Sequence, residues 1–299
     1  MKKFIYIIVL GLFFICLINK AYAQEFLEIT DEQVVSTILD GNSKDLEKLI
    51  ISGLNVNDVY ECATPLILAI KSSMVPESIN EDSLRKIQLL LKAGADINQE
   101  TCFDNARFPL TVLINLPLEI NAMAALFNKT LDEEIKSGQD MCEIPGIIAK
   151  PCKDITLKER ENIRITIQEA FTEQQKAIVP QMMNILQVLV ENGADINKKD
   201  SIRGRTALHH AAVISQNVTL APLKYLIEKG ADLNAQDIKG NTPLFFAFAT
   251  NNTLGVDMLI KAGADPSIRN KDGLLYNEVY GYRKPLQIKK EIQQYKLEK

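Results

Sequence analysis

The sequence predicts an all-α fold in which short helix pairs stack into a solenoid, and three observations support this prediction. A motif of Gly-Ala-Asp plus an apolar residue begins at Gly94, Gly193 and Gly230, with related copies at Gly263 and Gly53. A triplet of the Thr-Pro-Leu type follows four of the copies by about twelve residues. Apolar residues at helical spacing precede the glycines. Such self-similarity indicates stacked structural units.

Each motif has a local role in a helix pair. The triplets are Thr64-Pro65-Leu66, Phe108-Pro109-Leu110, Thr206-Ala207-Leu208 and Thr242-Pro243-Leu244. A threonine can cap the amides of a first helical turn, and proline is tolerated at the first helical position, so the triplets predict helix starts. The glycines can adopt the left-handed conformation that ends a helix. The Asp and Asn residues beside them suit a turn into an extended finger.

The chain resembles the ankyrin repeat family in these motifs, in Leu208-His209-His210-Ala211-Ala212 and in the Leu-rich stretches 87–91 and 258–260. The step from Gly230 to Gly263 is 33 residues, which is the ankyrin unit length. The steps of 41 and 99 residues that end at Gly94 and Gly193 indicate insertions. The resemblance implies an ankyrin-repeat solenoid of about five to six helix-pair units, with a helical-hairpin insertion in the third unit.

We expect six segments along the chain. They are a cleaved signal peptide (1–23), an N-terminal capping helix pair (24–57), ankyrin repeats (58–118), a helical insertion (119–179), ankyrin repeats (180–267) and a C-terminal capping repeat (268–299). Residues 108–116 and 180–192 are expected to form the two helices of the interrupted third unit.

The insertion is predicted to contain helices at 119–137 and 156–178. Thr156 and Glu159 have capping-box spacing. Five apolar residues share one face of the second helix: Ile163, Ile167, Ala170, Phe171 and Ile178. One interpretation packs this apolar stripe against the solenoid. The alternative presents the stripe to a partner.

The N-terminus has the features of an export signal. Lys2 and Lys3 precede an apolar run from residue 4 to 18, and Ala21-Tyr22-Ala23 predicts cleavage before residue 24. The run is short for a membrane span, although an uncleaved anchor is an alternative. The prediction is a chain exported to the periplasm or the medium, most simply from a bacterial cell. Asn-x-Thr sequons at 128, 217 and 251 would accept glycans in a eukaryotic secretory route.

The charge balance bears on the class of partner. Loss of the signal removes three of 34 basic residues and none of 38 acidic residues, which leaves 31 against 38, a net charge of about −7. A negative field disfavours phosphate backbones and anionic membranes, although Arg203-Gly204-Arg205 could form a local basic patch. We expect a monomer that binds a protein, with no nucleic-acid or membrane partner after signal cleavage.

Four cysteines would remain after cleavage: Cys62, Cys102, Cys142 and Cys152. In an oxidising compartment they predict disulfides, and free thiols are the alternative. Cys142 and Cys152 flank a stretch with two prolines and a glycine, which predicts a turn between them and favours their pairing. Cys62 and Cys102 fall in the fingers of neighbouring units. Their spacing matches no zinc or thioredoxin-like motif.

The sequence offers no catalytic, cofactor or metal motif. Its two histidines, His209 and His210, are adjacent on a predicted helix and would point about 100° apart, so together they do not make a two-ligand metal site. The resemblance implies a structural hydrogen bond for His209 within the stack. His210 replaces an apolar residue of the family pattern. Nucleophile-elbow, phosphate-loop and dinucleotide motifs are absent from the sequence.

The resemblance implies binding through finger tips and the exposed ends of the inner helices, which line one concave face. The matching residues are Tyr60, Glu61, Lys71, Ser72, Arg203, Arg205, Val213, Ile214, Lys239, Asn241, Ala249 and Thr250. Tyr60, Arg203 and Arg205 are the strongest candidates because Tyr and Arg dominate interface energetics.

The prediction is therefore an exported, non-catalytic scaffold for a protein partner. Two alternatives stay open: a secreted host-interaction (virulence-type) factor that uses the insertion, and an accessory or protective subunit of an envelope enzyme. An enzyme carried by the insertion is the least favoured hypothesis.

Overall fold

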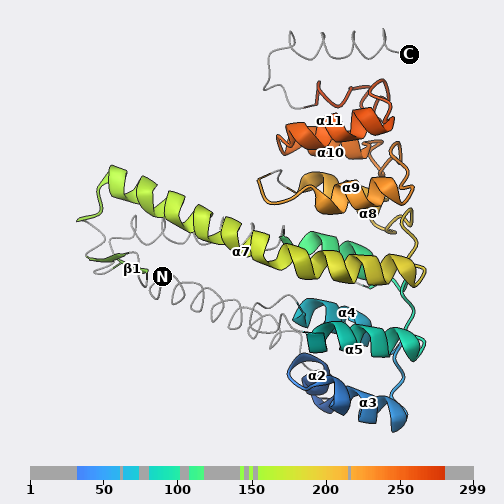
Figure 1. Cartoon of the computed structure of the whole chain (residues 1–299). Helices are drawn as coiled ribbons and strands as arrows, with labels where there is room; N and C mark the ends of the chain where they lie inside the picture. Colours follow the sequence, from blue (N-terminus) through green and yellow to red (C-terminus); the bar gives the residue numbers. More distant parts are fainter. Residues whose placement is uncertain are drawn as a thin grey trace. The chain divides into compact units, whose positions relative to one another are not determined.

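A computed structural model describes residues 32–60, 63–73, 81–101, 108–117, 142–144, 148–150, 154–214 and 217–279. The chain divides into two compact units. Unit 1 holds residues 1–96 and 116–185, and unit 2 holds residues 97–115 and 186–299. The regular secondary structure of the described residues is helical apart from one short hairpin (Figure 1).

Unit 1 begins with two helix pairs. Helices α2 (Glu32–Leu39) and α3 (Ser43–Ile51) form the first pair, and α4 (Pro65–Ser72) and α5 (Glu81–Lys92) form the second. Helix α2 packs against α4, and α3 packs against α5 (Figure 1). The core between the pairs includes Ile38, Leu46 and Ile87, each fully buried. Since burial of one such side chain contributes roughly 1.5–3 kcal/mol, stacking of the pairs is the main source of their stability.

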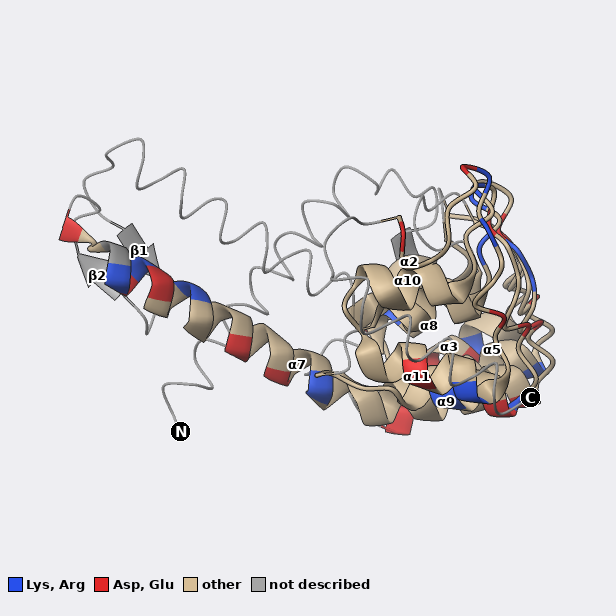
Figure 2. Ribbon diagram, turned by 90° about the horizontal axis from the view of Figure 1, so that it is seen from above, with Lys and Arg blue, Asp and Glu red and all other residues tan. Residues whose placement is uncertain are grey.

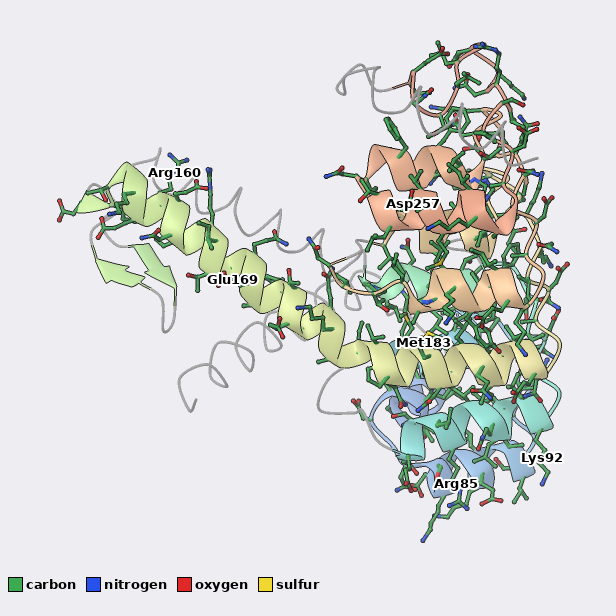
Figure 3. All side chains as sticks on the ribbon, turned by 45° about the horizontal axis from the view of Figure 1, so that its top comes forward. Arg85, Lys92, Arg160, Glu169, Met183 and Asp257 are labelled. Atoms are coloured by element: carbon green, nitrogen blue, oxygen red, sulfur yellow. The ribbon has the colours of Figure 1, made fainter. Side chains whose placement is uncertain are left out.

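Polar contacts fix the pairs of unit 1 together. The carboxylate of Asp82 on α5 accepts hydrogen bonds from the backbone amide of Ser43 at 2.9 Å and from its hydroxyl at 2.5 Å, at the first turn of α3. Lys86, one turn further along α5, is buried and donates to the carbonyl of Ile38 on α2 at 3.0 Å. Burial lowers the pKa of Lys86, and the nearby carboxylates of Asp82 and Asp40 oppose that shift. By contrast, Arg85 projects outward from α5 (Figure 3).

The helix α7 (Leu157–Glu191) differs from the prediction. It begins at the predicted capping box, because the amide of Glu159 donates to the Thr156 hydroxyl and the Thr156 amide donates to the Glu159 carboxylate. It then runs for 35 residues through Pro180, so the predicted break between 178 and 180 is wrong. A proline inside a helix costs about 3 kcal/mol. The exposed Pro180 lies between Ile178 and Met182, both fully buried, and burial of these residues offsets that cost.

The apolar stripe on the first half of α7 is covered. Ile163 is 5% exposed, Ile167 is 3% exposed and Ile178 is fully buried. The interpretation in which the stripe is presented to a partner is therefore wrong for these three residues. Charged residues lie along the remaining surface of α7 (Figure 2), and Arg160 and Glu169 project from it (Figure 3), although Ile165 on the same helix is 48% exposed.

A β-hairpin occurs within the predicted insertion. Strand β1 (Cys142–Ile144) pairs antiparallel with β2 (Ile148–Lys150), with Cys142 opposite Lys150. The predicted turn after Cys142 is thus confirmed as the connection of a hairpin, although the strands themselves were not predicted. The predicted helix at 119–137 lies outside the described residues.

Unit 2 contains the best-matched repeats. Helices α8 (Ala207–Val213) and α9 (Ala221–Glu228) form one pair, and α10 (Pro243–Ala249) and α11 (Thr253–Ala262) form the next. Helix α8 packs against α10 and α9 packs against α11 (Figure 1). Residues 109–117 are also helical, as the triplet at Phe108 predicts, and residues 109–115 belong to this unit. The aromatic ring of Tyr276 is 2% exposed and stands edge-on to Phe248 at 5.4 Å beyond α10.

An asparagine ladder joins successive repeats within each unit. The side-chain oxygen of the Asn that follows each Gly-Ala-Asp type motif accepts a hydrogen bond from the amide of the Asp in the next motif. The pairs are Asn57 with Asp96 in unit 1 (2.6 Å), and Asn98 with Asp195 (2.9 Å), Asn197 with Asp232 (2.8 Å) and Asn234 with Asp265 (2.8 Å) in unit 2. Asn98 and Asp195 are 97 residues apart in the chain. The large insertion therefore separates two motifs that are adjacent in space.

The predicted fold class, an all-α repeat solenoid, is confirmed. The motif glycines Gly53, Gly94, Gly193, Gly230 and Gly263 all have positive φ, from 85° to 108°, at helix ends. One detail differs. Thr64 accepts a hydrogen bond from the amide of Ile67, whereas the side chain of Thr242 makes no capping hydrogen bond at the start of α10.

Candidate functional site

The fingers of unit 2 are three loops, residues 199–205, 236–241 and 269–274, of which the first two lead into α8 and α10. Each loop folds around a buried polar side chain. The carboxylate of Asp200 accepts from the amides of Ile202 at 3.1 Å and Arg205 at 2.9 Å. Asp237 and Asn270 make the corresponding bonds in the other two fingers. These acceptors satisfy loop amides and give the three fingers similar backbones.

Backbone hydrogen bonds link neighbouring fingers. The amide of Ile238 donates to the carbonyl of Arg203 at 2.8 Å, and the amide of Lys271 donates to the carbonyl of Lys239 at 2.9 Å. Gly240 allows the close contact between its own finger and the finger that contains Lys271. At Gly240, with φ at +79°, a Cβ atom would lie 2.8 Å from the amide nitrogen of Lys271. The fingers are therefore a connected, ordered surface.

His209 ties helix α8 to the next finger. Its Nδ1 atom accepts from the amide of Thr206 at 3.0 Å, so its Nε2 atom carries the proton and donates to the carbonyl of Asn241 at 3.2 Å. Burial lowers its pKa to about 4, and the bond to the Asn241 carbonyl partly opposes that shift. The structural hydrogen bond predicted for His209 is confirmed.

His210 is also buried, at 5% exposure, on the same helix. Burial, together with the positive charge of Arg205, lowers its pKa to about 3. A neutral, buried imidazole packs in the core much as the apolar residue of the family pattern would. Both histidines thus have positions inside the stack, away from solvent.

The predicted site residues of unit 2 fall into two groups. Arg203, Arg205, Lys239 and Asn241 lie in the fingers, at the N-terminal ends of α8 and α10. Val213, Ala249 and Thr250 lie at the C-terminal ends of the same two helices. A helix of seven residues is about 10 Å long, so each helix separates the two groups by roughly that distance.

The prediction of Ile214 as a contact residue is wrong. Its side chain is 1% exposed, so it does not offer a contact surface. Its carbonyl accepts from the side-chain amide of Asn252 at 2.9 Å, and Asn252 also caps α11. This bond explains the burial, because it holds the end of α8 against the start of the outer helix α11.

The side chain of Arg205 makes contacts within unit 2. Its guanidinium lies 4.5 Å from the ring centroid of Phe246, and its Nε atom is 3.8 Å from the buried carboxylate of Asp237. Its side chain is 27% exposed.

Three of the predicted site residues, Tyr60, Lys71 and Ser72, belong to unit 1. Tyr60 is half-buried and forms an isolated bridge with Ala63, with Tyr60 N donating to Ala63 O at 2.9 Å. Lys71 and Ser72 lie at the end of α4 and are half-buried. Glu61, Cys62, Cys102 and Cys152 lie outside the described residues, and of Cys142 only the backbone is described. The proposed disulfides stay predictions.

Several exposed finger residues were missed, among them Ile202, Ile238 and Lys271. Ile202 is 44% exposed and Ile238 is 53% exposed. Each lies between the buried Asp or Asn of a finger and its glycine. Alignment of the three fingers on this buried Asp or Asn and on the glycine would have found these residues, because the residues between the two positions form the tip of the finger.

In the described part of the chain, no helix is long and apolar enough to cross a membrane. The described side chains also contain no group of three or more His, Cys, Asp or Glu residues placed to hold a metal ion.

Comparison with known proteins identifies the repeats. Residues 177–270 match the family model for ankyrin repeats, in three copies. An ankyrin repeat protein of Rickettsia felis is 27% identical over 73% of this chain and 55% of its own length. The human ankyrin repeat and SOCS box protein 6 is 33% identical over 32% of this chain and 24% of its own length. The nuclear factor NF-kappa-B p105 subunit of Gallus gallus is 28% identical over 73% of this chain and 18% of its own.

The chain therefore spans about half the length of the Rickettsia relative and less of the other two. The matched region includes α8 to α11 and their fingers. Repeats of this type imply a protein–protein interaction scaffold and are generally non-catalytic.

Proposed function

The chain carries ankyrin repeats, and on that premise we propose that it is an exported scaffold that binds a protein partner through the fingers of unit 2, without catalysis. The observation that carries the proposal is the arrangement of the fingers. Hydrogen bonds within the fold order their backbone, Lys239 and Ile238 are exposed on it, and Arg203 is half-buried. An ordered surface of this kind loses little conformational freedom on binding.

The two histidines support a binding role over a catalytic one. General acid–base chemistry requires a side chain that reaches the substrate. His209 uses both ring nitrogens within the stack, and His210 is buried. Their lowered pKa values follow from burial and so do not indicate an active site by themselves.

Export is the second part of the proposal. It is supported by the signal-like pattern of residues 1–23, with two lysines, an apolar run and small residues before position 24. Fractionation of the producing cells tests it. A processed chain in the periplasm or medium is expected, and a chain confined to the cytoplasm at full length would contradict export.

Capture experiments test the binding face. Residues 24–299, immobilised as bait, should retain a protein from the compartment in which the chain resides. Substitution Arg203→Ala should reduce that capture, whereas Lys224→Ala should leave it unchanged, since Lys224 is an exposed cation on the outer helix α9. Equal capture by both variants would show that the fingers are not the binding face.

A further inference from the structure

We infer that the fingers of unit 2 recognise an acidic protein segment that carries large apolar side chains. This inference rests on the proposed function and adds the chemistry of the partner. It depends on three properties of the fingers: the sign of their exposed charge, their exposed isoleucines and their ordered backbone.

The exposed charge of the fingers is positive. The three loops contain six Lys or Arg residues and three Asp residues: Lys199, Arg203, Arg205, Lys239, Arg269 and Lys271 against Asp200, Asp237 and Asp272. Asp200 and Asp237 are only 8% and 6% exposed, and backbone amides surround their carboxylates. Stretches of ribbon coloured for Lys and Arg are visible on the loops at the right edge of Figure 2.

Nearby acids reduce this charge without reversing it. Asp272 is exposed, Glu100 accepts a hydrogen bond from the amide of Ser201, and Glu278 pairs with Arg269 at 3.2 Å. The chain as a whole has a formal net charge of −4. The fingers are therefore a positive region on a negative chain, which directs an acidic partner to this face.

Exposed apolar side chains are concentrated on the same loops. Seven large hydrophobic residues are exposed among the described residues, and three of them lie in the fingers: Ile202, Ile238 and Leu274. Ile238 is placed directly beside the finger that holds Ile202, because its amide bonds to the carbonyl of Arg203. Isolated exposed apolar residues are ordinary, but neighbours on one surface indicate contact with another protein.

The ordered backbone fixes where these groups stand. Besides the two bonds between neighbouring fingers, the side-chain amide of Asn270 donates to the Asn241 side chain at 3.1 Å. Lys199 extends along its neighbour and donates to the carbonyl of Gln236 at 2.8 Å. The cations and isoleucines are thus presented at fixed spacing, which favours one extended partner segment over diffuse attraction.

A nucleic acid would also respond to the positive charge. Phosphate backbones are bound mainly by Lys and Arg, with a strong dependence on salt. Exposed Ile202 and Ile238 add nothing to phosphate contacts, whereas they suit the apolar side chains of a peptide. The combination favours a protein segment.

A displayed library of random peptides of about 12 residues provides the probe. Sorting on the purified protein should enrich peptides with net negative charge and at least one large apolar residue. Their affinity should fall about tenfold or more in the variant Lys239→Glu/Lys271→Glu, and also in Ile238→Ser. The control Lys224→Glu/Lys229→Glu reverses two exposed charges at α9 and should leave affinity unchanged. Circular dichroism and urea midpoints confirm that each variant is folded, and Lys239→Gln/Lys271→Gln serves if charge reversal unfolds the chain.

Several results would overturn the inference. These are enrichment of neutral or basic peptides, equal binding by the finger variants, or no enriched peptide together with binding of a single-stranded RNA probe. The proposed function is tested separately by capture with Arg203→Ala. If that capture is lost while the selected peptides are not acidic, only the partner chemistry is wrong. If capture is unaffected by finger substitutions, the proposed function fails.

Discussion

Acidification should reveal that both histidines stay neutral well below their ordinary pKa. The chain contains only His209 and His210, so each gives one assignable ring resonance. Burial lowers the two pKa values to about 4 and about 3. At about pH 5 a histidine with the ordinary pKa would be almost fully protonated, whereas His209 should be protonated in about one molecule in ten and His210 in fewer.

The same shifts predict how stability depends on pH. Because both pKa values are lower in the folded state than in the unfolded state, the unfolded chain binds more protons below about pH 6.5. Their contribution is complete above pH 6.5 and declines as the pH falls toward the folded values. Between about pH 7 and pH 5 the free energy of unfolding should fall by about 2 kcal/mol for each histidine, or about 4 kcal/mol for the pair.

Two measurements check this prediction. Carbon-13 NMR of the imidazole Cε1 atoms gives the folded pKa values, and urea unfolding at several pH values gives the slope of stability. His210→Leu should remove about half of the slope, since leucine keeps the buried position apolar. A midpoint near pH 6.5 for either ring, or an unchanged slope in the variant, would refute the assignment of both rings to the core.

Three substitutions test the packing within each unit. Asp82→Ala on α5 removes the acceptor for the amide and hydroxyl of Ser43 at the start of α3, so the free energy of unfolding in urea should fall by about 1–3 kcal/mol. The control Gln88→Ala changes an exposed residue of α5 and should alter that free energy by less than about 0.5 kcal/mol. Gly240→Ala should lower the melting temperature more than Gly273→Ala. The two glycines have similar φ values, +79° and +76°, but only at Gly240 would a Cβ atom lie 2.8 Å from a backbone nitrogen. Equal effects of the two substitutions would show that contact between the fingers is unimportant. Tyr276→Ala should cost about 3 kcal/mol by urea unfolding, because the buried ring contacts the aromatic residues of α10, and a loss below about 1 kcal/mol would contradict this packing.

The repeat pattern predicted the helix pairs because each motif begins or ends a helix. The motif glycines end helices, and the Thr-Pro-Leu triplets begin them, as α4 and α10 show. The role of the motif asparagine was less apparent. Its side chain was expected to serve a local turn, but it bonds to the next repeat along the stack. Sequence spacing alone does not reveal this contact, since its partner can be 97 residues away.

The continuity of α7 shows where local rules fail. Pro180 predicts a helix start, but Ile178 and Met182 are buried on either side of it. Packing of the apolar residues across the proline therefore outweighs its local preference. The same limit applies to Ile214, whose burial depends on a hydrogen bond from Asn252 in the next pair.

The candidate site was predicted in part. Arg203, Lys239 and Asn241 were placed in fingers from the family pattern, and they lie there. The outward isoleucines were missed because an exposed apolar residue has no signature of its own in a loop, although their place between the buried Asp and the glycine of each finger marks them as tip residues. Their significance depends on neighbouring fingers being joined by backbone hydrogen bonds.

Hydrogen–deuterium exchange with and without the captured partner tests the proposed binding face most directly. Binding through the fingers should slow exchange at residues 199–205, 236–241 and 269–274, with the outer helices α9 and α11 unchanged. Slower exchange confined to α9, α11 or α7 would contradict it.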